Sequence, residues 1–205
     1  MKTRNLIALA AAAILLSACI PSVNPFYTKK DLVFDPRLIG LWGNPDDKDE
    51  SWRFEVATNE TYQLTVTEDE GKRGEFAAHL FQLKGHMFLD VTPTKAELRE
   101  DQPSMVAAAL IPGHLILRVR SFEPELKLDW VDWDWLKKHL EANPKALKHR
   151  LCDTPESIVL TAETRDLQRF VLKHLKAGEL FKIEQPDKGL MRLTNAPSAV
   201  TVPAK

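Results

Sequence analysis

The sequence predicts an α+β domain, in which a curved or half-closed antiparallel sheet carries C-terminal helices packed on it. Apolar and polar residues alternate along several short stretches between residues 51 and 130, which is the period of strands with one buried face. After residue 132 the period changes to that of helices. Strands that come first and helices that come mostly afterwards are typical of the α+β class.

Four strands are expected in the first half of the domain. Residues 51–57 and 62–67 alternate between apolar and polar side chains, and a short loop joins them as a hairpin. A third strand over 75–83 and a fourth over 86–91 flank a two-residue loop, Lys84-Gly85. Glycine in such a loop supplies the positive φ that a tight hairpin turn needs.

The tight loop also fixes the register of this second hairpin. Phe81 then faces Phe88, and His79 faces Asp90, on one mixed face of the sheet. The other face is wholly apolar and is expected to be core; it carries Phe76, Ala78, Leu80, Met87, Leu89 and Val91. A sheet that is half apolar on its second face usually has another layer over part of that face.

Two further strands and two helices are expected in the second half. Residues 115–120 and 126–130 alternate again, with Pro124 between them. Helical spacing covers about 132–141. Asn143-Pro144 ends this helix and is typical of the start of a further helical turn or two, in which Leu147 and Leu151 lie one turn apart.

A short strand over 158–161 precedes the clearest helix, which Thr164 caps and Gly178 ends. Its apolar stripe consists of Leu167, Phe170, Val171 and Leu175, and its basic side consists of Arg165, Arg169, Lys173 and Lys176. We expect this helix to lie on the sheet with Phe170 at its centre. A last weak hairpin is expected over 180–193.

Composition limits the function. The chain has 205 residues with 28 basic and 29 acidic side chains, and the charges are interspersed, so a nucleic-acid partner is not expected. No stretch other than the first is long and apolar enough to approach a membrane span.

The first residues carry a targeting pattern. Lys2 and Arg4 precede an apolar segment over 6–16, which is too short for a transmembrane helix and ends in Leu16-Ser17-Ala18-Cys19. This motif resembles the lipobox of bacterial lipoproteins. The resemblance implies cleavage before Cys19, a diacylglyceryl thioether on its sulfur and an acyl chain (commonly palmitate) on its new amino group. The alternative is an ordinary cleaved secretory peptide.

The resemblance implies a signal peptide over 1–18, and the composition of the rest predicts a tether over 19–38, one domain over 39–193 and a disordered tail over 194–205. Loss of residues 1–18 leaves 26 basic side chains against 29 acidic ones, so the mature net charge is −3. A lipidated Cys19 also leaves Cys152 without an intramolecular disulfide partner.

Two further resemblances concern the domain. Gly40-x-Trp42 at the entrance to the first strand resembles the Gly-x-Trp that opens lipocalin-type barrels, although the later strands depart from regular hairpins. Asp134-Trp135-Leu136, Asn143-Pro144, Val159-Leu160-Thr161-Ala162 and Leu167-Gln168-x-Phe170 resemble bacterial envelope lipoproteins of unknown function. The second resemblance implies no chemistry.

Three groups of residues are candidates for a site. His149, Cys152 and Asp153 could be a nucleophile arrangement, but a core thiol is the simpler interpretation. A metal site could be formed by His79, His86, Asp90 and His114. The alternative interpretation is a cross-strand His–Asp pair that binds no metal. Trp130, Trp133 and Trp135 lie among aspartates at a strand-to-helix corner, where Asp132 or Asp134 would cap the helix.

We therefore expect a lipid-anchored envelope protein that binds a ligand or partner and is not an enzyme, with no cofactor and no metal. The residues expected to bind are Trp130, Trp133, Trp135, Phe81 and Phe88. Expected partners are the membrane, through the lipid anchor, and an apolar small molecule or an envelope protein. The alternatives are an envelope hydrolase and a structural or assembly lipoprotein. Ile20 after the lipidated cysteine favours the outer membrane in a cell with two membranes.

Overall fold

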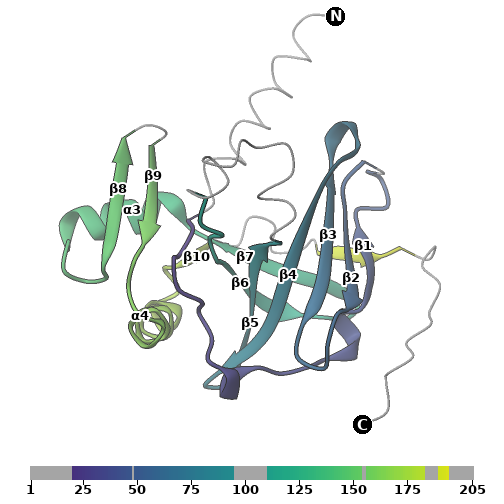
Figure 1. Cartoon of the computed structure of the whole chain (residues 1–205), viewed down its shortest axis with the longest axis horizontal. Coiled ribbons are helices and arrows are strands. Elements are labelled where there is room, and N and C mark those ends of the chain that lie inside the picture. Colours follow the sequence, from purple (N-terminus) through teal and green to yellow (C-terminus); the bar gives the residue numbers. More distant parts are fainter. Residues whose placement is uncertain (1–19, 48, 95–109, 154–155, 183–188, 194–205) are drawn as a thin grey trace, which may run out of the picture.

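The computed structural model describes residues 20–47, 49–94, 110–153, 156–182 and 189–193, and it confirms the predicted α+β class (Figure 1). A closed antiparallel barrel forms one part of the domain, and two α-helices and a small hairpin lie beside it. The strands are β1 (Gly40–Gly43), β2 (Ser51–Val56), β3 (Tyr62–Glu68), β4 (Lys72–Leu83), β5 (His86–Pro93), β6 (Leu115–Ser121), β7 (Glu125–Val131), β8 (His149–Asp153), β9 (Glu156–Leu160), β10 (Phe181–Lys182) and β11 (Leu190–Arg192). The helices are α3 (Trp133–Ala142) and α4 (Thr164–Ala177), with short 3₁₀ turns η1 (Lys29–Asp31), η2 (Pro36–Leu38) and η3 (Asp69–Gly71).

Among the described residues, eight strands close the barrel in the order β11-β1-β2-β3-β4-β5-β6-β7. The ring closes because β7 pairs with β6 on one side and with β11 on the other. Closure leaves none of these eight strands as a long open edge, which is the hazard of an open sheet. The result agrees with the lipocalin-like barrel that Gly40-x-Trp42 suggests.

The register predicted around Lys84-Gly85 is confirmed. Phe81 pairs with Phe88 and His79 with Asp90, and the loop residues both have positive φ, 50° and 86°. The apolar face points into the barrel and the mixed face points outward.

Two predictions about the second half are wrong. Residues 149–153 form strand β8, paired with β9, and the further helical turn predicted after Asn143 does not form. Asn143 is the C-cap of α3, so the predicted end of that helix is confirmed. Residues 180–193 do not form a hairpin, because β10 and β11 both pair with β7. β11 also pairs with β1, so the demand for barrel closure overrides the local turn signal. The helices therefore precede the last two strands in the chain.

The barrel interior is a packed core. Eight strands leave an interior that side chains can fill, and here large aromatic and aliphatic residues fill it. Its buried members are Leu38, Trp42, Phe54, Tyr62, Leu64, Ala78, Leu80, Leu89, Val91, Leu117, Val119, Phe122 and Leu126.

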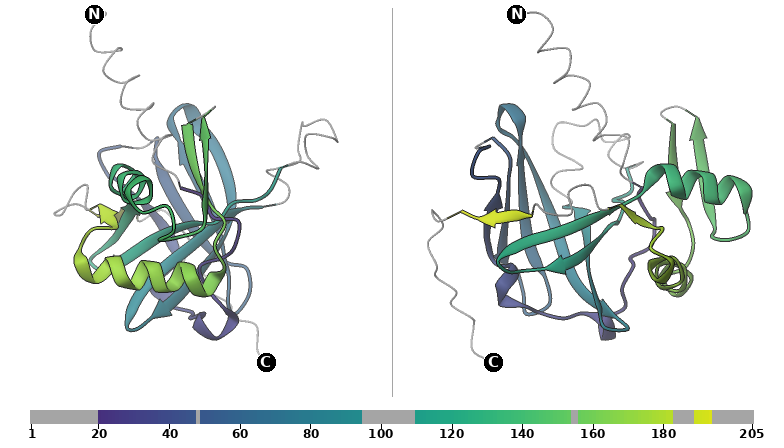
Figure 2. Two further views of the ribbon diagram at one scale, coloured as in Figure 1. Left: turned by 90° about the vertical axis from the view of Figure 1, so that its left-hand side faces the viewer. Right: turned by 180° about the vertical axis from the view of Figure 1, so that it is seen from behind.

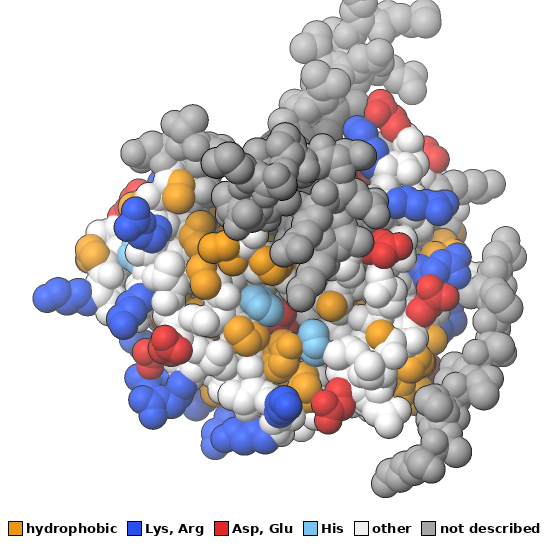
Figure 3. Space-filling model, in the orientation of Figure 1, with side chains coloured by type: hydrophobic (Ala, Val, Ile, Leu, Met, Phe, Trp, Pro, Cys, Tyr) orange, Lys and Arg blue, Asp and Glu red, His pale blue; other side chains and the backbone are white. Residues whose placement is uncertain are grey.

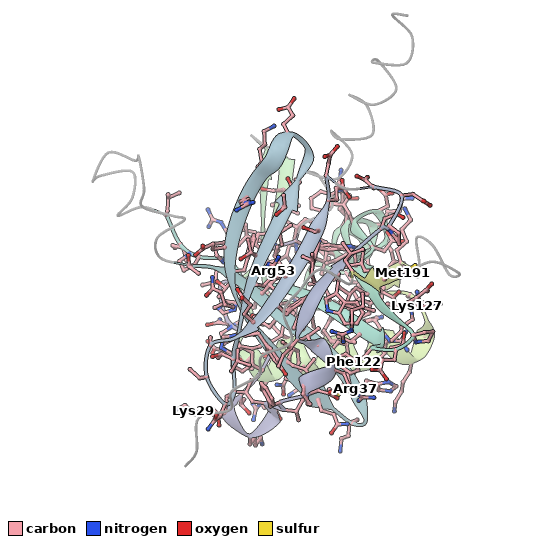
Figure 4. All side chains as sticks on the ribbon, turned by 90° about the vertical axis from the view of Figure 1, so that its right-hand side faces the viewer. Lys29, Arg37, Arg53, Phe122, Lys127 and Met191 are labelled. Carbon is pink, nitrogen blue, oxygen red and sulfur yellow. The ribbon has the colours of Figure 1, made fainter. Side chains whose placement is uncertain are left out.

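One end of the barrel is closed around Trp42. Its indole N–H donates to the Leu38 carbonyl at 2.8 Å, and the Arg192 guanidinium lies 4.3 Å from the ring centroid. Gly40 has φ +139°, and a Cβ there would lie 2.3 Å from Nη1 of Arg192, so a side chain would strain the backbone and displace the arginine. Phe122 and Arg37 lie together near this end (Figure 4), with the guanidinium 4.9 Å from the ring centroid.

A second core lies outside the barrel. The outer side chains Phe81, Phe88 and Ile116 pack there with α3, α4 and the β8–β9 hairpin. Figure 2 shows α4 lying across the barrel strands, with α3 on the same side. The predicted stripe of α4 is confirmed for Leu167, Phe170 and Val171, which are buried together with His174. Neither described helix has the length and apolar character that a membrane crossing requires.

Candidate functional site on the outer face of the barrel

Asp90 is a fully buried carboxylate on the outer face of β5. Strand alternation places it there, because Leu89 and Val91 on either side point into the barrel. Oδ1 accepts a hydrogen bond from Nδ1 of His114 at 2.7 Å, and Oδ2 accepts one from the backbone N–H of Phe26 at 2.9 Å. A buried carboxylate is tolerated only with such partners.

The segment that contains Phe26 is built into the fold. The backbones of Ser22 and His114 exchange two hydrogen bonds, at 2.9 and 2.8 Å, and the N–H of Val23 donates to Leu160 at 2.9 Å. On the α4 side, Thr164 donates to the Pro25 carbonyl at 2.8 Å and Gln168 donates to the Phe26 carbonyl at 2.9 Å. We call residues 20–27 the N-terminal strap. It joins the barrel, the β8–β9 hairpin and α4.

His79 and Tyr27 complete the polar cluster around Asp90. Their rings stack with centroids 4.6 Å apart, and Nδ1 of His79 is buried without a hydrogen-bond partner. Burial lowers the pKa of His79, and the nearby His114 lowers it further while Asp90 opposes the shift. Burial raises the pKa of Tyr27 to about 12, with a smaller contribution from Asp90. Both side chains are therefore neutral at pH 7.

The predicted pairing of His79 with Asp90 is thus part of this cluster, whereas His114 and the strap come from elsewhere in the chain. His114 presents Nδ1 to Asp90, so Nε2 is the ring nitrogen left for another partner. A carboxylate that orients a histidine is one half of a general acid–base arrangement. Within the described ranges, no hydroxyl or thiol hydrogen-bonds to His114, and no group of three His, Cys, Asp or Glu side chains could hold a metal ion.

Of the five residues predicted to bind, two lie in the second core. Phe81 and Phe88 are fully buried, with ring centroids 5.5 Å apart. Tyr27 of the strap and Phe181 of β10 pack against them, at 6.0 and 5.9 Å. A ligand would reach neither ring unless the strap moved.

The three tryptophans lie in two places. Trp130 points into the barrel and packs edge-on against Trp52 at 6.1 Å. Trp133 and Trp135 are half-buried in the first turn of α3, where Asp132 caps the helix by accepting the Trp135 N–H at 2.9 Å. The predicted cap is therefore confirmed.

Trp135 belongs to an aromatic group between α3 and α4. Its ring stacks on His139 at 4.7 Å, and His139 lies 4.6 Å from His174. His174 is buried, bonds to Glu179 at 3.1 Å through Nδ1 and leaves Nε2 without a partner. Burial lowers the pKa of His139, and His174 lowers it further. This group holds the helices together and offers no cleft.

Among the described side chains, no base is paired with the thiol of Cys152. Cys152 is half-buried on β8, and Nδ1 of His149, on the same strand, bonds to the Leu147 carbonyl at 2.8 Å. Cys19, the predicted lipidation site, lies outside the described residues, as does the whole tail predicted over 194–205.

Two hollows lie in the described part of the chain. An apolar cavity of about 10 Å³ lies in the second core between Ile20, Leu136, Leu167 and Phe170. It has room for about one water molecule. A shallow, open hollow lies over the turn at Asn143–Ala146.

No protein-family model, curated protein or solved structure matches this chain.

Proposed function

We propose that this protein is a lipid-anchored lipoprotein of the bacterial envelope that binds a partner protein through its outer surface and has no enzymatic activity. The lipobox supplies the anchor, and the packed barrel supports a scaffold role because its interior is occupied by the protein's own side chains. The observation that carries the proposal is the strap: Ile20 and Ser22, which follow directly after the cysteine that would carry the lipid, are buried in the domain.

The filled barrel also narrows the class of ligand. An apolar small molecule would need a cavity of several hundred Å³, and the apolar cavity in the second core measures only about 10 Å³. A partner on the outer surface is therefore favoured over a small molecule inside the barrel. In a cell with two membranes, Ile20 after the cysteine favours the outer membrane.

The anchor is tested with the two cysteines of the chain. Cells that express the full-length protein are fed an alkyne analogue of palmitate, and acylation and precursor size are read from gels. Cys19→Ser should abolish the label and leave an uncleaved precursor, whereas Cys152→Ser, the matched control, should keep both the label and cleavage. A cleaved, membrane-retained Cys19→Ser protein would refute the lipid anchor.

One observation favours an envelope hydrolase as the second candidate, namely the His114–Asp90 pair. If His114 acted as a general base, His114→Gln would abolish hydrolysis of ester or amide substrates while the protein stayed folded. Unchanged binding to an envelope partner in that variant would support the non-enzymatic proposal.

A further inference from the structure

The strap leaves almost no free chain between the fold and the cysteine. Ile20 is buried, Ser22 is fully buried, and both lie in the packed structure of the domain. Consecutive Cα atoms are about 3.8 Å apart, so a lipid on Cys19 holds the surface around Ile20 within about one residue of the membrane interface. Residues 20–27, which belong to the tether predicted over 19–38, are packed on the domain and therefore give it no distance from the bilayer.

Exposed apolar side chains surround this point. Val23 lies on the strap and is 41 % exposed, and Leu110 and Ile111, at 42 % and 69 %, precede His114, the pairing partner of Ser22. The two segments lie side by side, since a Cβ on Gly113 would lie 2.8 Å from Cβ of Pro21. Figure 3 shows hydrophobic and histidine side chains gathered on the face seen in Figure 1.

We propose that Val23, Leu110 and Ile111, the anchor-proximal patch, insert into the membrane interface and fix the orientation of the domain. This inference rests on the proposed lipid anchor. The occupant is the bilayer because the anchor would hold this patch at the interface, where exposed aliphatic side chains partition favourably. Without the bilayer, the aliphatic side chains of this patch would remain exposed to water as an apolar cluster, which is typical of a surface that binds a partner.

The orientation follows from β6. Its seven residues rise about 3.3 Å each, so its far end lies roughly 20 Å from the patch. That far end carries the β6–β7 turn with Phe122, and Arg37 lies over its ring (Figure 4). The closed end of the barrel would therefore face away from the membrane and be available to an envelope partner.

A fluorescence experiment tests the patch on the full-length protein, processed in cells and reconstituted into vesicles of phosphatidylethanolamine and phosphatidylglycerol. In a Cys152→Ala background, Ile111→Cys or Val23→Cys is labelled with a polarity-sensitive thiol dye. Met191→Cys is the matched control, because Met191 is also apolar and 45 % exposed but lies on β11, which pairs with the start of β7 beyond the β6–β7 turn. Quenching by lipids that carry a spin label near the headgroup is then measured.

We expect a blue-shifted emission and several-fold stronger quenching at positions 111 and 23 than at position 191. Equal, water-like spectra at all three positions overturn the patch and leave a partner protein as its occupant. The Cys152→Ala parent reports on the anchor separately: a thioether at Cys19 leaves it unreactive toward the dye. A labelled parent overturns the lipid anchor, and the patch with it.

Discussion

Asp90→Ala should release the strap from the barrel. The substitution removes the acceptor of two hydrogen bonds, one from the Phe26 N–H and one from His114. A hydrogen bond to a charged group contributes about 1.5–3 kcal/mol, and removal of one partner from a buried pair costs about 3–5 kcal/mol. We therefore expect the free energy of unfolding to fall by about 3–5 kcal/mol, since the Phe26 N–H is left without its acceptor. Asp90→Asn should cost less because the amide can still accept one of the two bonds.

Urea denaturation of the form that begins at Ile20 measures the change, and hydrogen exchange shows where it acts. Amides of residues 22–27 should lose protection before those of β3. The control is Asp166→Ala, which removes an exposed ion pair with Arg169 and should stay within about 0.5 kcal/mol. If the Asp90 and Asp166 variants lose equal stability, the backbone bridges of Ser22 hold the strap without the carboxylate, and the reasoning fails.

Three other predictions concern the second core and the histidines. Phe170→Ala should lower the free energy of unfolding by about 3–5 kcal/mol, because the side chain is only 7 % exposed between α4 and the barrel. Arg169→Ala should change it by no more than about 0.5 kcal/mol. Equal losses of the two variants in a denaturation experiment would refute the packing of Phe170 in the second core. Cys152→Ala should leave partner binding intact, which a pull-down would test. It should lower the free energy of unfolding by at most a few kcal/mol, which thermal denaturation would test. Because burial lowers the pKa of His79, the contribution of this neutral side chain to the free energy of unfolding is present above about pH 6.5. That contribution is lost as the pH falls toward the lowered pKa of His79 in the folded protein. In His79→Gln the free energy of unfolding should therefore fall less steeply between pH 7 and 5, and the part of the fall that remains includes the contribution of His139, whose pKa is lowered in the same way.

Local signals in the sequence were sufficient to predict the central hairpin. The Lys84-Gly85 loop determines which residues face each other, and the alternation on either side determines which face is core. The stripe of α4 could be predicted for the same reason, because helical spacing places Leu167, Phe170 and Val171 on one side.

Pairings between distant segments could not be predicted in this way. β11 closes the barrel by pairing with β1 and β7, and nothing within residues 189–193 distinguishes that arrangement from a local hairpin. Residues 149–153 form a strand because β9 follows them closely, although Leu147 and Leu151 have a helical spacing. In both cases the pairing partner decided the structure, and local propensity was too weak to oppose it.

The candidate site also combines a contact that local signals predict with contacts from distant segments that they do not predict. The hairpin register placed His79 opposite Asp90, but the two groups that bond to the carboxylate come from segments outside that hairpin. The Phe26 N–H lies 64 positions from Asp90 in the chain, and a backbone donor leaves no mark in the sequence. Phe26 and Tyr27 are adjacent aromatic residues in an otherwise tether-like segment, and such a pair is a sequence feature from which docking on the domain could be predicted.

The strap covers apolar side chains on the outer face of the barrel. A barrel with a packed interior needs only one apolar side on each strand, yet Phe81, Phe88 and Ile116 make the outside of β4, β5 and β6 apolar as well. The helices cover this face from one side, and Ile20 and Phe26 of the strap cover it from another. A lipid on Cys19 would then pull directly on the element that seals the second core. Stability of the strap and position at the membrane would therefore be coupled, and a variant that loosens Asp90 should alter both.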